Sequence, residues 1–148
     1  MNSRCLDNDE AFIEYRQLFF DYLDAHALSH TSERFAIMRE VYIIGVHFNV
    51  ETLLTRLKQQ KYQVSRATLY HTLDLMVDCG LVIKHYFDGG PAVYECAFRV
   101  PFHDHILLND GQCIEFSDPR LDEIIASLEA EHGLKVTGRS LLLRAERR

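Results

Sequence analysis

Apolar residues recur at three- and four-residue steps through the first half of the chain, and this spacing predicts four helices. The first is expected over residues 10–26, with several aromatic side chains on its inward face. Each of the other three follows a residue whose side chain can cap a helix, and two of them precede a glycine suited to a helix end. The residues expected to cap or end these helices are Thr31 or Ser32, Gly45, Asn49, Ser65 and Gly80.

After Gly80 the pattern changes to the two-residue alternation of strands. The segments LVIKHYF and PAVYECA, separated by the turn DGG, predict a β-hairpin. Three helices followed by a hairpin is the order of a winged helix, in which the helix before the wing enters the major groove of DNA. The pattern therefore predicts a DNA-binding unit in the first two thirds of the chain.

The last third predicts a second, smaller α+β unit, so the expected fold class is α+β. The segments HDHILL and QCIEF read as strands, Asp118 and Pro119 begin a helix that ends at His132–Gly133, and LKVTGRSLLLR reads as a last strand. That helix is expected to turn Leu121, Ile124, Ile125 and Leu128 inward. We expect a winged-helix DNA-binding domain with an N-terminal helical extension over residues 1–97, a hinge over 98–102, and a dimerisation and metal-sensing domain over 103–148. A unit this small has a thin core, which favours a homodimer.

Charge is distributed unevenly along the chain. The net charge is −6, but residues 29–86 hold 7 basic and 5 acidic side chains, a local charge of +2 between two segments of −4 each. Local basic surface permits nucleic-acid binding whatever the chain average. No apolar run is long enough to span a membrane and no signal peptide begins the chain, so a cytoplasmic protein with free thiols is expected.

Two histidines separated by one residue suggest a metal site. Along a strand His103 and His105 point to one face and Asp104 to the other. Glu115 on the adjacent strand, or Glu95 at the end of the hairpin, could complete a site for a transition metal. On spacing alone, a metal site and a pair of structural histidines are both open.

Several motifs together make the chain resemble the ferric uptake regulator family. They are SRATLYHTLDLMVDCGLV, FDGGPAVYE, HDH, IEFSDP and EHGLKVTGRSL, in an order and spacing that cover residues 30–142. The resemblance implies a metal-dependent homodimeric repressor of metal homeostasis genes that binds double-stranded DNA at an AT-rich inverted repeat. It implies one divalent transition metal per chain, zinc, iron(II) or manganese, bridging the two domains as corepressor. The ligands implied are His47, Glu95, His103, His105 and Glu115.

The resemblance also implies a DNA-binding surface. Tyr70 matches a tyrosine of the recognition helix, and His71 stands where the family usually has arginine. Arg56, Lys58 and Lys61 are expected on a solvated helix face instead. The implied DNA-binding residues are Arg34, Ser65, Arg66, Thr68, Tyr70 and His71.

Departures from the family pattern lie in its other metal sites. No C-x-x-C occurs, so the four-cysteine structural zinc cannot form, and Cys96 and Cys113 are expected as small apolar filler. A further family site would fall on Phe102, Asp104, Asp122 and Arg139. We expect this second site to be metal-free, with Arg139 pairing with Asp104 or Asp122 in place of an ion.

Two other functions stay open from the sequence. One is a DNA-binding regulator whose zinc is purely structural and which senses haem or thiol oxidation through Cys96 or Cys113. The other is a metallohydrolase, which five protein ligands disfavour because they leave little room for a reactive water. We therefore expect a protein that is not an enzyme and that does not associate with membranes.

Overall fold

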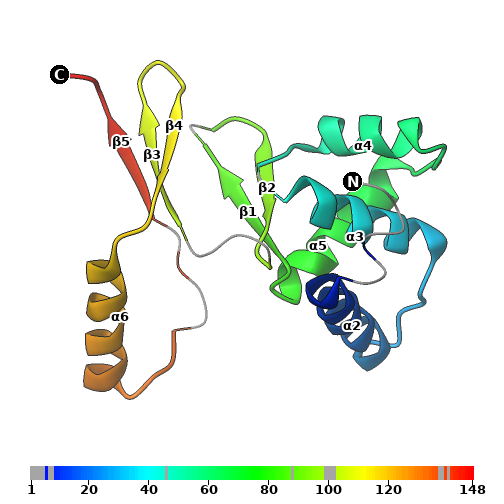
Figure 1. The fold of residues 1–148 in the computed structure, drawn as a ribbon, viewed down its shortest axis with the longest axis horizontal. Helices are drawn as coiled ribbons and strands as arrows, with labels where there is room; N and C mark the ends of the chain where they lie inside the picture. Colours follow the sequence, from blue (N-terminus) through cyan, green and yellow to red (C-terminus); the bar gives the residue numbers. More distant parts are fainter. Residues whose placement is uncertain are drawn as a thin grey trace. The chain divides into compact units, whose positions relative to one another are not determined.

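The computed structural model describes residue 6 and residues 9–45, 47–87, 89–98, 103–136, 139 and 141–148. The fold is α+β, and the chain divides into two compact units, Met1–Pro101 and Phe102–Arg148 (Figure 1). Residues 99–102 of the expected hinge, and Phe102 of the expected second site, lie outside the described residues. Among the described helices, none is long and apolar enough to cross a membrane.

Within residues 9–98 of the first unit, the structure describes four helices, and each begins at a side-chain cap. They are α2 (Glu10–Ala25), α3 (Ser32–Ile44), α4 (Val50–Gln59) and α5 (Arg66–Asp78). The three expected caps are confirmed: Thr31, Asn49 and Ser65 each accept a hydrogen bond from a first-turn backbone N–H. Gly45 and Gly80 adopt positive φ values of 71° and 78°, as a residue beyond a helix end should.

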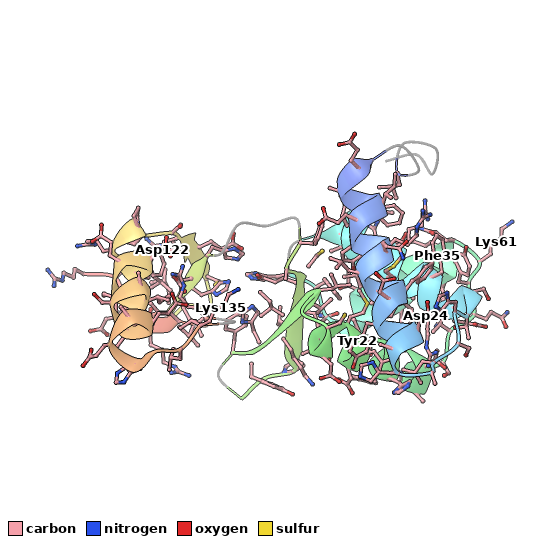
Figure 2. The ribbon with its side chains drawn as sticks, turned by 90° about the horizontal axis from the view of Figure 1, so that it is seen from below. Tyr22, Asp24, Phe35, Lys61, Asp122 and Lys135 are labelled. Atoms are coloured by element: carbon pink, nitrogen blue, oxygen red, sulfur yellow. The ribbon has the colours of Figure 1, made fainter. Side chains whose placement is uncertain are left out.

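An aromatic cluster joins α2 to α3 within the core of the first unit. Tyr15 of α2 and Tyr42 of α3 are buried with ring centroids 5.0 Å apart, and Phe12 lies 5.0 Å from Tyr42. The Tyr42 hydroxyl donates to Asp9 Oδ2 at 2.9 Å, so the residue that caps α2 also holds it to α3. In Figure 2 the side chains of α2, with Tyr22 and Asp24 labelled, lie beside those of α3, where Phe35 is labelled.

A buried carboxylate fixes α3 against α4 and corrects one expectation. Glu40 of α3 is buried, and its Oε2 accepts from Arg56 Nε at 3.0 Å. Gln60 donates to the other oxygen. Arg56, whose side chain is 40% exposed, is therefore partly solvated and also ion-paired, and its charge compensates a carboxylate that has left water.

The wing is an antiparallel hairpin of β1 (Val82–Tyr86) and β2 (Ala92–Cys96). A bridge between Phe48 and Tyr94, with reciprocal backbone hydrogen bonds of 2.8 Å, adds the segment before α4 to the other edge of β2. The strand β2 therefore lies between β1 and residues 47–48. This placement determines which side chains surround Glu95.

The described residues of the second unit form a three-stranded sheet and one helix. The strand β3 (Asp104–Leu108) pairs antiparallel with β4 (Cys113–Phe116) and parallel with β5 (Leu142–Ala145). Between β4 and β5 the chain forms α6 (Pro119–His132), capped by Asp118 and ended by Gly133 in the left-handed conformation. The expected start and end of this helix are confirmed.

Two expectations about burial in the second unit are wrong. None of the residues of α6 is buried within the chain, and Ile124 and Leu128 are exposed, not packed inward. The apolar stripe exists but is only partly covered by the described chain, because Leu121 and Ile125 are half-buried and Ile124 and Leu128 are exposed. Cys113 is also exposed, so it does not act as apolar filler, whereas Cys96 is buried as expected.

Candidate metal centre

The first unit brings two histidines to a single carboxylate. Phe48 pairs with Tyr94, so the preceding residue His47 lies opposite Glu95 at the edge of β2. On the other side Ile83 pairs with Glu95, and His85, two residues further along β1, points to the same face. Backbone pairing alone therefore places Glu95 between two imidazoles.

Distances in this cluster are short enough for a shared ion. His47 Nε2 lies 2.8 Å from Glu95 Oε2, and His85 Nε2 lies 3.5 Å from the same oxygen. The Glu95 side chain is only 4% exposed. A carboxylate removed from water needs a positive charge close by, supplied by an imidazolium or a metal ion. Neutral imidazole and carboxylate together suit zinc, iron(II) and manganese.

The second unit assembles its own three candidate ligands. The β3–β4 register places His105 opposite Glu115, and His103 lies two residues before His105 on the same face. The rings of His103 and His105 have centroids 4.9 Å apart, and His103 Nε2 lies 3.9 Å from Glu115 Oε1. The ligand atoms of all three residues lie within 4.8 Å of one another. One ion could therefore bind all three with small rotations of the side chains.

Each unit therefore gathers the sequence-predicted ligands that it contains. His47 and Glu95 meet in the first unit, and His103, His105 and Glu115 meet in the second. His85 was not predicted as a ligand. His85 is identified only by the register of the hairpin, which pairs Ile83 with Glu95. The sequence of the two strands does not give that register.

The opposite face of β3 carries a buried acid that is paired with arginine. Arg139 Nη2 lies 3.1 Å from Asp104 Oδ2, and its Nη1 donates to Asp122 Oδ1 at 2.8 Å. Asp122 projects from α6 (Figure 2). The expected pairing is confirmed, with both acids instead of one. Among the described residues no hydrogen bond reaches either Asp104 oxygen, so the guanidinium charge is what compensates this carboxylate.

The expected DNA-binding residues gather around the start of α5. A groove is lined by Thr31, Glu33, Arg34, Gln63, Ser65, Thr68 and His71. Tyr70 is exposed beside it and lines a second hollow with Pro91 and Ala92 of the wing. The groove contains the first turns of two helices, whose dipoles attract phosphate.

Several of these residues are already engaged within the chain. Arg34 Nη1 donates to the Ser29 carbonyl at 2.5 Å. Ser65 donates its hydroxyl proton to Thr68 Oγ1 at 2.9 Å, so of the two hydroxyls only that of Thr68 keeps a proton to donate outward. Arg66 pairs with Glu51 of α4, and its Nη2 donates to Oε2 at 3.0 Å. The hydrogen bond from Arg66 lowers the pKa of the Glu51 carboxyl. A DNA phosphate would therefore have to compete with Glu51 for the Arg66 guanidinium.

The chain is similar in sequence to one family of known proteins. The model of the ferric uptake regulator family matches residues 25–144. The ferric uptake regulation protein of Campylobacter jejuni is 32% identical over 137 residues, which cover 88% of this chain and 87% of that protein. The protein of the same name from Shigella flexneri is 36% identical over 98 residues, a match that spans 66% of each chain.

A solved structure extends the agreement to the fold. The ferric uptake regulator of Pseudomonas aeruginosa, determined with manganese, superimposes with a TM-score of 0.73 at 30% identity. The superposition covers 85% of this chain and 95% of that one. The range matched by the family model includes the winged helix and both His103 and His105. The chain therefore belongs to the ferric uptake regulator family, whose members are metal-responsive transcriptional regulators.

Proposed function

We propose that this protein is a cytoplasmic, metal-dependent DNA-binding repressor of metal homeostasis genes, with a divalent metal ion as corepressor. The observation that carries the proposal is the position of Glu95. Glu95 is a buried carboxylate beside two imidazoles. The neighbouring Tyr94 is hydrogen-bonded through its backbone to Phe48, which lies just before α4. A metal at Glu95 would therefore act directly on the DNA-binding unit.

The proposed ion takes ligands from both units. His47 and Glu95 come from the winged-helix unit, and His103, His105 and Glu115 come from the second unit. An ion held by both would favour one orientation of the two units over all others. For corepression it must bind the DNA-competent arrangement more tightly than the alternatives, since an ion without that preference shifts nothing.

Three imidazoles and two carboxylates suit zinc, iron(II) or manganese. Manganese was present in the Pseudomonas aeruginosa structure, which supports manganese as one candidate ion. With no C-x-x-C pair in the sequence, we propose one ion per chain and no four-cysteine zinc.

The proposed DNA surface is the groove at the start of α5 together with exposed Tyr70. Arg34 and Thr68 are placed to contact phosphates, which fix position, while Tyr70 and His71 on the recognition helix are placed to meet base edges. The proposed target is an AT-rich inverted repeat. The repeat follows from a homodimer that presents two copies of the recognition helix, and the AT-rich composition follows from the family resemblance. The exposed Ile124 and Leu128 of α6 support dimerisation through the second unit.

The experiment that tests this function is DNA selection followed by affinity measurement. Sequences are selected from a random pool with metal present, and the best is titrated with full-length protein in added zinc, iron(II) or manganese, and in chelator. Wild type should bind at least tenfold more tightly with metal. Glu95→Gln and His103→Ala should lose that gain, while Glu131→Gln and His132→Ala, on the exposed end of α6, should keep it.

Two results would contradict the proposal. DNA binding that is equal in metal and in chelator would remove the corepressor role. A metal whose removal melts the protein, with no effect on DNA affinity while the fold lasts, would point instead to a purely structural ion.

A further inference from the structure

We propose that His85 is a metal ligand, and that His47, His85 and Glu95 form a three-ligand divalent-metal site complete within the winged-helix unit. The inference rests on the proposed function and deepens it. It adds a ligand on the wing itself, so that an ion ties both strands of the wing to the segment that begins α4.

The strand register brings these three residues to one place. Glu95 is on the middle strand, β2; His47 is its direct neighbour on one side, and His85 is its diagonal neighbour on the other. Side chains directly opposite or diagonal on one face of a sheet are within reach of each other when they are long. The site therefore depends on backbone hydrogen bonds of the hairpin, not on a flexible loop.

The distances suit a common ion. Two ligands about 2.0–2.1 Å from a tetrahedral zinc lie about 3.3–3.4 Å apart. The 3.5 Å between His85 Nε2 and Glu95 Oε2 matches that separation more closely than it matches a hydrogen bond. His47 Nε2 at 2.8 Å from the same oxygen has to move away by only about 0.5 Å on this reckoning. All three ligand atoms lie within 4.8 Å of one another.

The surroundings favour an ion over exposed, solvated side chains. The His85 side chain is 9% exposed and that of Glu95 is 4% exposed. The ring of Phe87 stacks on His85 with centroids 5.6 Å apart at 17°, and lies 6.1 Å from the ring of His47. This apolar ring fixes the orientation of His85 and limits water, which strengthens the interaction of a cation with Glu95.

A site with this composition connects three parts of the DNA-binding unit. An ion bound to His85, Glu95 and His47 would hold β1, β2 and the entry to α4 in one arrangement. The wing and the helix-turn-helix would then be coupled by metal inside one unit, before any ligand from the second unit is bound. Loss of His85 should weaken metal binding and also loosen the wing.

The test uses the full-length protein with zinc and cobalt(II) as probes. His85→Gln and His85→Ala are compared with wild type and with the matched control His132→Ala, an exposed histidine at the end of α6. We expect the zinc dissociation constant to rise at least tenfold for both His85 variants and to stay unchanged for the control. Thermal unfolding of the metal-free proteins checks that the variants fold.

A measurement on wild type removes any dependence on the variants. The ¹⁵N resonances of the His85 ring should shift on zinc addition in the manner of a metal-bound imidazole nitrogen. An unshifted ring together with an unchanged dissociation constant would overturn the ligand role, and metal-dependent DNA binding in that case would leave the proposed function intact. The opposite result is a shifted His85 ring together with a DNA affinity that is the same with and without metal. It would support the metal site and contradict the proposed metal-dependent repression.

Discussion

Arg139 offers a quantitative test of how the second unit is held together. Its guanidinium joins two acids that differ sharply in burial. The Asp104 side chain is 1% exposed and lies 3.1 Å from Arg139 Nη2, while Asp122 is 71% exposed and lies 2.8 Å from Nη1. The shorter contact is the weaker one energetically, because an exposed ion pair contributes at most about 1 kcal/mol.

Arg139→Met keeps the aliphatic stem and removes the charge. Asp104 would then be a buried carboxylate without its cation, and breaking such a pair from one side costs about 3–5 kcal/mol. Asp122→Asn should cost less than about 1 kcal/mol. The double variant Asp104→Asn, Arg139→Met should recover part of the loss, because no charge then remains buried.

Urea unfolding followed by circular dichroism, at one fixed protomer concentration, measures these differences. Asp110→Asn, in the β3–β4 turn, is the control for loss of an acid elsewhere in the unit. The reasoning is refuted if Arg139→Met is within 1 kcal/mol of wild type, or if Asp122→Asn costs as much. Arg139→His should also let the protein bind one more zinc per chain than wild type binds.

Three further predictions concern the DNA-binding unit. Glu40→Ala should lower its free energy of unfolding by about 1–3 kcal/mol in a urea titration, because Arg56 and Gln60 lose a buried partner; an unchanged midpoint would deny Glu40 that role. Glu51→Gln should tighten DNA binding and steepen its salt dependence by about one charge, because Arg66 becomes available to phosphate, and an unaltered slope would exclude that contact. Ser65→Ala should cost about 1 kcal/mol of stability as a lost helix cap, and a loss seen only in DNA affinity would assign the hydroxyl to phosphate instead.

The sequence predicted local structure well because its signals are local. Caps such as Asn49 and Ser65 act on N–H groups within their own first turn, so four residues contain the whole interaction. The stripe on α6 shows the limit of periodicity. The spacing of Ile124 and Leu128 predicts which face of the helix is apolar. It does not predict whether another part of the chain packs on that face, and both residues are exposed.

Residues whose role depends on distant pairing were the ones missed. Arg56 contacts Glu40 sixteen positions earlier, and nothing in the spacing of α4 indicates a buried acid on α3. His85 becomes a candidate ligand only through the register that sets Ile83 against Glu95. His47 was predicted as a ligand only through the family resemblance, because nothing in the local sequence distinguishes it from a solvent-exposed histidine before a helix cap.

The most direct measurement of the central claim is the metal affinity of the full-length protein with and without its selected DNA. Coupling between two ligands is reciprocal, so an ion that raises DNA affinity tenfold must itself bind tenfold more tightly to the DNA complex. We expect zinc to bind at least tenfold more tightly when DNA is present, with the gain lost in Glu95→Gln and kept in Glu131→Gln. Equal zinc affinity in the presence and absence of DNA would contradict metal-dependent regulation by this protein.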